Sequence, residues 1–153
     1  MNAATNELQE IYRQRVLEHS KHPHNFGRPA MTTHEAVGFN PLCGDKLTVY
    51  LQMEGDRISA VKFEGTGCAI SVASASMMTD AIQDQSADQA HELIGAAQKV
   101  FTSGDSAGKK TLEEVDALGG VSSYPSRIKC ASLAWSTAEA ALAGTGKQVT
   151  TES

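Results

Sequence analysis

Cysteine, aromatic residues and long hydrophobic runs are all scarce in this sequence of 153 residues. The three cysteines cannot all pair within one chain, and an odd, well-separated set favours metal ligation or thiol chemistry over a disulfide framework. No run approaches the roughly 18 apolar residues of a membrane helix, so we expect no membrane span. The first residues mix Glu7, Glu10 and Arg13 with apolar side chains, which does not fit a secretory signal and predicts a cytoplasmic protein.

Basic residues are also few. Lys and Arg number 13 and are scattered, against 18 Asp and Glu, which gives a net charge of -5. Nucleic-acid binding requires clustered Lys and Arg, so we expect no nucleic acid and look for protein or small-molecule partners instead. A hydrophobic fraction of 41% and a charged fraction of 20% are typical of one globular domain, which we expect to span residues 1–153.

Hydrophobic periodicity predicts a chain of helices around one hairpin. Alternating residues over Lys46–Met53, turn residues at 54–56 and a second apolar run over 57–64 predict two antiparallel strands. Residues 21–40 contain two prolines and two glycines without a sustained period, which predicts a long loop. Apolar residues at helical spacing predict helices over residues 6–20, 69–83, 87–102 and 130–144, with a short helical piece near 112–118. Residues 145–153 are polar and are expected to form a flexible tail.

The first cysteine stands in Cys43-Gly44-Asp45, directly before the first predicted strand. Glycine between the two side chains permits a turn that brings the Cys43 sulfur and the Asp45 carboxylate toward one point. A metal ion or a shared proton requires such an arrangement.

The other two cysteines stand beside predicted helix starts. Cys68 follows Gly65-Thr66-Gly67 and precedes the helix over 69–83, where the positive end of the helix dipole predicts a lowered thiol pKa. Cys130 follows Arg127 and Lys129, and two neighbouring cations predict a lowered pKa for this thiol as well.

Cys43, Asp45, Cys68 and Cys130 together supply a four-ligand set suited to tetrahedral Zn(II). A carboxylate in place of a fourth thiolate makes the set less soft, so we expect a metal more open to ligand exchange than one held by four thiolates. The alternatives are that each cysteine is a small buried hydrophobic residue and that Asp45 is a turn or cap residue.

Three histidines cluster after the first predicted helix. His19, His22 and His24 offer imidazole ligands, but helix-end capping and solvated loop positions explain the same spacing. Two other site types are excluded by pattern. Gly65 and Gly67 lack the Lys-Ser/Thr of a phosphate loop, and the His-x-Glu and Cys-x-x-Cys pairs of a zinc deaminase are missing.

Four segments in order resemble the U-type iron-sulfur assembly proteins, the family of IscU, SufU and the NifU N-terminal domain. The segments that carry the resemblance are Asn40-Pro41-Leu42-Cys43-Gly44-Asp45, Phe63-Glu64-Gly65-Thr66-Gly67-Cys68-Ala69-Ile70-Ser71, Ala73-Ser74-Ala75-Ser76-Met77-Met78 and Arg127-Ile128-Lys129-Cys130-Ala131. The resemblance implies an α+β fold, in which a small antiparallel sheet packs against helices (SufE/NifU-like), and a surface site built from the three cysteines and Asp45.

Three departures make the chain look like the SufU branch rather than the IscU scaffolds. IscU-type proteins carry His directly before the third cysteine, where this chain has Lys129. They also carry a Leu-Pro-Pro-Val-Lys chaperone motif, which is missing here. Residues 103–126 resemble a SufU-type insertion between Cys68 and Cys130.

The resemblance implies a zinc-dependent sulfurtransferase of iron-sulfur cluster biogenesis that accepts persulfide sulfur on Cys43 from the cysteine desulfurase SufS. Asp45, Cys68 and Cys130 would stay on the zinc while a desulfurase histidine replaces Cys43. Arg127 matches a desulfurase-facing arginine, although an exposed arginine is commonly only solvated. Other Suf assembly proteins are further expected partners.

Two other functions stay open at this point. One is an assembly scaffold that binds iron or an iron-sulfur cluster on the same cysteines, for which thiolate ligands are equally suitable. The other is a purely structural zinc domain that serves as an interaction platform.

Overall fold

One four-stranded sheet, in the order β3-β2-β1-β4, organises the computed structural model, which describes residues 3–144 and 149–150. The strands β1 (His34–Asn40), β2 (Asp45–Glu54) and β3 (Arg57–Thr66) are antiparallel neighbours. β4 (Val149–Thr150) adds a short parallel pairing to β1. The predicted hairpin is confirmed, because β2 and β3 are joined through the turn residues Gly55 and Asp56.

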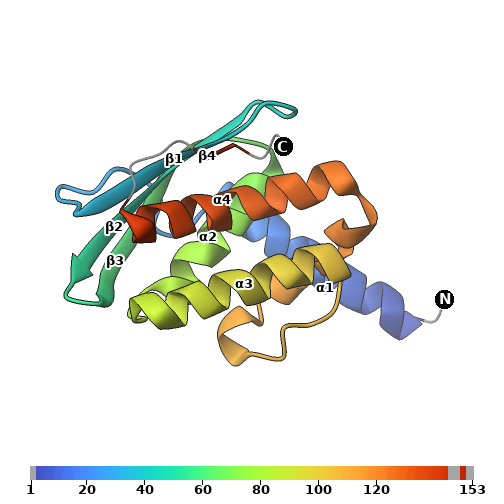
Figure 1. Ribbon diagram of the computed structural model, residues 1–153. Helices are drawn as coiled ribbons and strands as arrows, with labels where there is room; N and C mark the ends of the chain where they lie inside the picture. The colour runs from blue at the N-terminus through green and yellow to red at the C-terminus, as the bar shows by residue number, and fades with distance from the viewer. Residues whose placement is uncertain (1–2, 145–148, 151–153) are drawn as a thin grey trace.

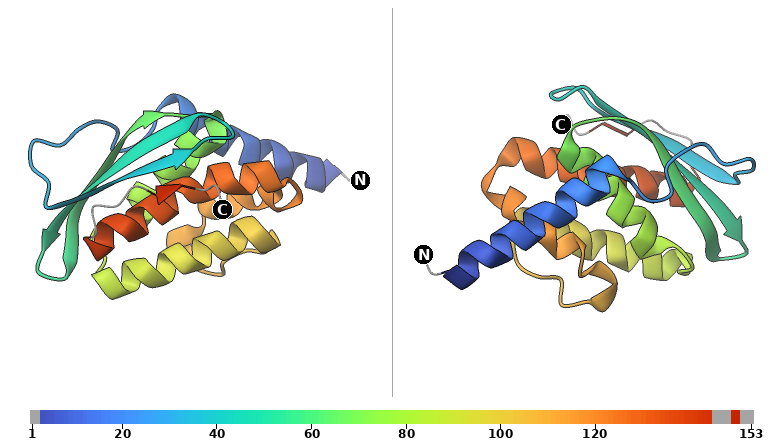
Figure 2. Two further views of the ribbon diagram at one scale, coloured as in Figure 1. Left: turned by 45° about the horizontal axis from the view of Figure 1, so that its top comes forward. Right: turned by 180° about the vertical axis from the view of Figure 1, so that it is seen from behind.

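The helices pack together on one face of this sheet (Figure 1). The right-hand view of Figure 2 shows the molecule from behind, with α1 lying across the other helices. There α1 contacts α2 and η2. The predicted α+β fold with a small antiparallel sheet packed against helices is therefore confirmed. The helical elements are α1 (Ala3–Lys21), α2 (Ala69–Ile82), α3 (Ala87–Ser103), the 3-10 helices η1 (Lys110–Leu112) and η2 (Val115–Ser123), and α4 (Pro125–Ala143).

The core lies between the sheet and the helices α2 and α4. Leu47 and Phe63 from the sheet and Leu133 and Trp135 from α4 are fully buried there. Burial of each large apolar side chain contributes about 1.5–3 kcal/mol. The indole Nε1 of Trp135 donates to Ser74 Oγ on α2 at 2.9 Å, so the polar edge of the largest core side chain is also satisfied.

The strand β1 lies within the region predicted to be a loop over residues 21–40, so that prediction is wrong for residues 34–40. Its inward-facing positions are Ala36, Gly38 and Asn40, which do not produce the alternation of large apolar residues that marks a strand. These small residues are needed because α4 passes close by. A Cβ atom on Gly38 would lie 1.9 Å from Thr137 Oγ1.

The last helix begins earlier than residue 130, its predicted first residue. α4 starts at Pro125, a residue favoured in the first helical turn because its missing N–H needs no partner there. Cys130 consequently lies inside the helix and not at its N-terminus. The helix ends at Ala143 and is capped by Gly144, which adopts the left-handed conformation with φ 67°.

Residues 103–126 form a compact connection between α3 and α4. The predicted helical piece near 112–118 is present as two 3-10 helices, with Leu112, Val115 and Leu118 buried. Asp116 holds the preceding loop, because its carboxylate accepts the Ala107 N–H at 2.9 Å and the Ser106 hydroxyl at 2.8 Å. The segment is thereby attached to the helical core.

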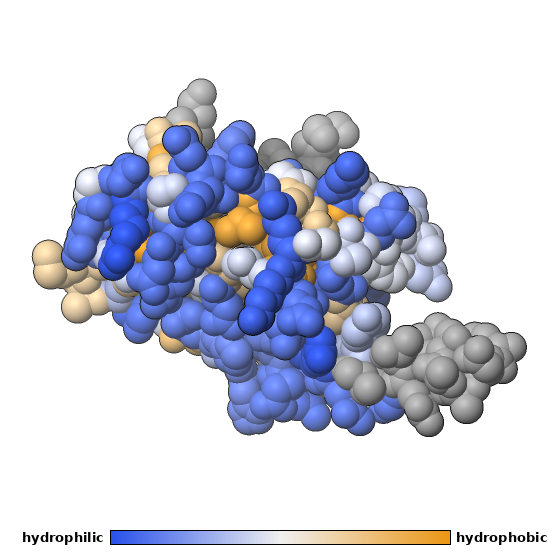
Figure 3. All heavy atoms as spheres, turned by 90° about the horizontal axis from the view of Figure 1, so that it is seen from below, coloured by the Kyte–Doolittle hydropathy of each residue, from blue (hydrophilic) through white to orange (hydrophobic). Residues whose placement is uncertain are grey.

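The outer surface carries small hydrophobic areas among hydrophilic side chains. In the view from below, hydrophobic residues appear as recessed patches within a largely hydrophilic face (Figure 3). Across residues 3–144 and 149–150, no helix has the length and apolar character needed to cross a membrane. Of the expected flexible tail, residues 149–150 form β4, and residues 145–148 and 151–153 lie outside the described part.

Candidate metal centre

The sheet brings Cys43 and Cys68 to the same edge. Asn40, the last residue of β1, pairs with Asp45, the first residue of β2, so Cys43 lies on the tight turn between them. β3 ends at Thr66, which pairs with Lys46 at the start of β2. Cys68 therefore emerges beside the Cys43 turn, although the two residues belong to different connections.

Two glycines allow this edge to form. Gly44 adopts φ 71°, a left-handed conformation that residues with a side chain avoid, and so permits the turn between Cys43 and Asp45. Gly65 adopts φ 139°, and a Cβ atom there would lie 2.1 Å from the Lys46 carbonyl oxygen. The close approach of β3 to β2 next to the cysteine loops thus depends on glycine.

α4 supplies the third cysteine from beneath the sheet edge. The Sγ atoms of Cys43 and Cys130 lie 3.4 Å apart. One ligand atom each from Cys43, Asp45 and Cys130 falls within 4.8 Å of the other two, which is close enough to hold a metal ion. Within this group Cys43 is exposed, whereas Asp45 and Cys130 are fully buried.

The carboxylate of Asp45 is oriented by two amide groups. Its Oδ1 accepts the backbone N–H of Cys68 at 2.9 Å, and its Oδ2 lies 3.4 Å from Asn40 Nδ2. A buried carboxylate is costly unless it is hydrogen-bonded, paired with a cation or bound to a metal. The bond to the Cys68 backbone fits the alternative of a turn or cap residue, and the place of Asp45 beside Cys43 and Cys130 fits a metal ligand.

The thiol pKa of Cys130 is shifted in the direction opposite to the predicted one. Burial raises the pKa of the Cys130 thiol, and hydrogen bonding with Cys43 and Cys68 adds to that effect. The predicted lowering of its pKa by Arg127 and Lys129 is therefore wrong for this arrangement. The cause is position, because Cys130 faces the core from within α4 and shares its surroundings with two other sulfurs and a carboxylate.

Cys68 caps the start of α2, as predicted, and is half-buried. Its backbone N–H donates to Asp45 Oδ1, and its thiol is near enough to Cys130 to help raise the pKa of that thiol. Its Sγ atom lies outside the tight group formed by Cys43, Asp45 and Cys130. The structure thus gathers three predicted ligands closely and places the fourth at the border of the same site.

Arg127 lies one turn before Cys130 on the exposed start of α4. Negative charge on Cys68 and Cys130, together with a hydrogen bond from Arg127 to Cys130, raises the pKa of the arginine. Arg127 is exposed to solvent, and the direction of this shift indicates that the cysteines lie near enough for its charge to act on them.

Asn40 is a site residue to which the sequence assigns no role. It is fully buried, and its Nδ2 lies within reach of both Asp45 Oδ2 and, at 3.7 Å, Cys130 Sγ. The Asn-Pro pair before the turn signals only a turn. Asn40 can be recognised as a site residue only when β1 is known, because the pairing of β1 with β2 places it opposite Asp45.

The donor set fits a transition metal. Thiolates and a carboxylate are ligands that Zn(II) accepts, and cysteine sulfurs also hold iron-sulfur clusters. Two sulfurs at 3.4 Å with a buried carboxylate nearby would repel one another once ionised, and a bound cation would offset this repulsion. The Cys43, Asp45 and Cys130 group can therefore bind a metal.

Known proteins resemble the chain over most of its length. It is 37% identical over 140 residues to the iron-sulfur cluster assembly scaffold protein IscU of Streptococcus pyogenes serotype M1, covering 91% of this chain and 87% of that protein. It is also 37% identical over 137 residues to the zinc-dependent sulfurtransferase SufU of Bacillus subtilis strain 168, covering 89% of this chain and 92% of that protein.

A solved structure shares the fold. The crystal structure of a hypothetical protein superposes with a TM-score of 0.82 and 35% sequence identity, covering 88% of this chain and 98% of that one. Residues 11–150 match the family model described as the NifU-like N terminal domain. Because that match includes the sheet, the helices and all three cysteines, the chain belongs to the family of NifU-like N-terminal domains.

Proposed function

We propose that this protein is a zinc-dependent sulfurtransferase of iron-sulfur cluster biogenesis, which accepts persulfide sulfur on Cys43 from a SufS-type cysteine desulfurase in the cytoplasm. The observation that carries the proposal is the contrast between one exposed cysteine and two buried ligands in the same group. Cys43 can meet a partner while Asp45 and Cys130 stay in place. The identity to a relative named as a zinc-dependent sulfurtransferase supports this assignment.

The transfer step needs no external oxidant or reductant. The Cys43 thiolate attacks the terminal sulfur of the desulfurase persulfide, and a new S–S bond forms at Cys43 Sγ. The S–S bond of the desulfurase persulfide breaks, and the desulfurase cysteine leaves as a thiolate that takes up a proton. Such exchange depends on the thiolate fraction of the attacking cysteine and on its access, and Cys43 has the access.

Asp45, Cys68 and Cys130 would hold the zinc when Cys43 engages the partner. Bound zinc would supply a redox-inert positive charge that keeps neighbouring thiols deprotonated. Asn40 and the Cys68 N–H keep the Asp45 carboxylate in position. Their role resembles that of the hydrogen-bonding groups that orient ligands in other metal sites.

The partner would approach across the exposed side of the cluster. Leu42 and Tyr124 are large hydrophobic residues with 66% and 64% of their surface exposed, on the segments that carry Cys43 and Arg127. Exposed apolar residues beside a charged group are typical of protein contact sites. Arg127 lies at the same edge and would contact the desulfurase or the incoming persulfide.

An assembly scaffold is the second candidate. The relative from Streptococcus pyogenes is named a scaffold and is as similar as the sulfurtransferase, and three cysteines suit iron ligation equally well. Lys129, which stands next to Cys130 where the IscU-type proteins carry His, favours the sulfurtransferase because a lysine ammonium does not ligate a metal.

The experiment combines metal analysis with a desulfurase assay. We expect the purified protein to contain one zinc at the cysteine site and to increase the turnover of a SufS-type desulfurase, with sulfane sulfur appearing on Cys43. Cys43→Ala should abolish the stimulation, whereas His91→Ala, an exposed α3 residue remote in sequence from the cysteines, should retain it. Iron with acid-labile sulfide at the site and no stimulation would favour the scaffold instead.

A further inference from the structure

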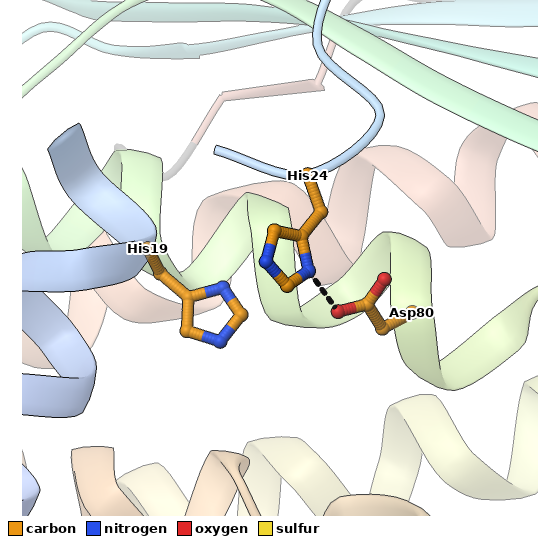
Figure 4. A group of neighbouring side chains, drawn as sticks. All are labelled: His19, His24 and Asp80. Atoms are coloured by element: carbon orange, nitrogen blue, oxygen red, sulfur yellow. Dashed lines mark hydrogen bonds and ion pairs between the residues drawn. The ribbon is translucent and has the colours of Figure 1, made fainter. Parts of the chain in front are cut away.

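A second cluster of metal-binding side chains lies away from the cysteines. His19 from the last turn of α1, His24 from the following loop and Asp80 from the last turn of α2 face one another (Figure 4). One ligand atom from each lies within 4.8 Å of the other two. Of the three histidines in the sequence cluster, the structure brings together His19 and His24 and leaves His22 outside the group.

His19 is held in place as metal-binding histidines commonly are. Its ring is nearly buried, with 5% of the residue exposed, and its Nδ1 lies 2.7 Å from Ser76 Oγ. A hydroxyl that fixes one ring nitrogen orients the other, and Nε2 of His19 lies 3.4 Å from the Glu114 carboxylate. A solvated or purely helix-capping histidine does not require such burial.

His24 and Asp80 are positioned from the neighbouring loop. His24 Nδ1 lies 2.5 Å from Asp80 Oδ2, and the His24 backbone N–H donates to Ser76 Oγ at 2.8 Å. Asn25 donates from Nδ2 to Thr79 Oγ1 at 3.0 Å, which attaches the loop to α2 beside Asp80. The loop is therefore fixed against α2 on both sides of the His24 ring.

We propose that His19, His24 and Asp80 form a second metal site that takes a divalent transition metal such as zinc. Two imidazoles and one carboxylate are nitrogen and oxygen ligands that zinc accepts, and water would complete its four-coordinate geometry. Magnesium and calcium prefer sites made of oxygen ligands alone.

This site is separate from the cysteine centre. Asp80 and Cys68 stand at opposite ends of α2, and their separation of 12 residues along the helix corresponds to about 18 Å. Its ligands come from α1, the loop after α1, and α2. A bound ion would therefore cross-link the N-terminal helix and the loop that follows it to α2, and would stabilise the folded chain by its binding free energy.

The test is zinc binding by the full chain. The metal-free protein is equilibrated with free zinc buffered at about one micromolar, which a site with three protein ligands can fill. We expect His24→Ala and Asp80→Asn each to bind one zinc fewer per chain than the wild-type protein. His22→Ala, an exposed histidine in the same loop, should bind as much zinc as the wild type.

A spectroscopic measurement separates the two sites. Cobalt(II) in place of zinc should give thiolate-to-metal charge-transfer absorption only at the cysteine site, and His24→Ala should leave that absorption unchanged while one cobalt is lost. The variants alter side chains that are about half exposed, so both should fold. Equal zinc contents in His24→Ala, Asp80→Asn and the wild type would overturn the proposal and leave a hydrogen-bonded His–Asp pair.

Discussion

The sulfur atoms of Cys43 and Cys130 lie 3.4 Å apart, although one residue is exposed on a turn and the other is fully buried in α4. The two thiols thus share one site but differ in access to solvent. In the metal-free protein, burial also raises the pKa of Cys130, which keeps this thiol protonated. Of these two neighbouring cysteines, only Cys43 is therefore open to a reagent from solvent.

The first prediction concerns thiol modification. In the reduced, metal-free protein at neutral pH, Cys130 should react with iodoacetamide at least about tenfold more slowly than Cys43, because each unit of raised pKa lowers the thiolate fraction tenfold. Mass spectrometry of proteolytic fragments measures both rates. After unfolding in urea the two cysteines should react at similar rates, and equal rates in the folded protein would contradict the difference in access.

The second prediction concerns Asp45. Asp45→Ala should weaken zinc binding by at least about 100-fold, since a ligand matters more than the groups that orient it, and should change sulfur transfer from the desulfurase. Competition with a chromogenic chelator measures the affinity. Asp116→Ala removes a carboxylate that only holds a loop and should leave the affinity intact. Unchanged zinc affinity in Asp45→Ala would argue against direct coordination.

The third prediction concerns Asn40, the buried amide between Asp45 and Cys130. Asn40→Ala should weaken zinc binding by about 10- to 100-fold, because the ligands lose a partner that orients them. It should also lower the free energy of unfolding by about 1–3 kcal/mol. Gln52→Ala, which alters a partly buried amide farther along β2, is the matched control. An affinity as high as that of the control would leave Asn40 with a structural role alone.

The sequence predicts a helix or strand correctly where the spacing of its apolar residues matches the face that the element buries. In α3, the apolar residues whose helical spacing predicts the helix over 87–102 are buried, namely Ala90, Leu93, Ile94, Ala97 and Phe101. Ser86 and Gln89 form a capping box at its start, which explains the accurate helix boundary. The β2–β3 hairpin is equally predictable, because Leu47, Val49 and Leu51 alternate with less apolar residues and a Gly-Asp turn follows.

The errors occur where a residue's role depends on a distant element. The inner face of β1 is small because Thr137 of α4 lies against Gly38, a contact that no local pattern reveals. The sequence predicts Cys130 at a helix start with a lowered thiol pKa, but α4 starts earlier and Cys130 is buried within it. The approach of Asp80 to His19 and His24 likewise depends on α1 packing against α2.

The fourth prediction compares two glycines beside the cysteine loops. Gly44→Ala should cost about 1–2 kcal/mol of unfolding free energy, because the position is left-handed but a Cβ atom there meets nothing within 4 Å. Gly65→Ala should cost more, since its Cβ would lie 2.1 Å from the Lys46 carbonyl oxygen and push β3 away from β2. Urea denaturation of both variants measures the difference. Equal losses of unfolding free energy in the two variants would show that β3 can shift away from β2 without an energetic cost.

The fifth prediction concerns Tyr50, a buried residue of β2 whose hydroxyl donates to the Glu64 carboxylate on β3. Burial first, and then the carboxylate of Glu64, raise the pKa of Tyr50 to about 12. Below a pH of about 10, the pKa of a free tyrosine, the folded and unfolded chains both keep the proton, so the contribution of Tyr50 to stability is complete there.

Between about pH 10 and pH 12 the unfolded chain releases this proton while the folded chain retains it, so the stability that Tyr50 contributes should be lost as the pH rises. Tyr50→Phe should be less stable by about 1–2 kcal/mol at neutral pH but should lack this alkaline loss. Urea unfolding at several pH values up to about 11 compares the slopes. Tyr124→Phe, which changes an exposed tyrosine, should keep the slope of the wild type. Parallel slopes for the wild type and Tyr50→Phe would show that the phenol ionises as easily in the folded chain as in the unfolded one.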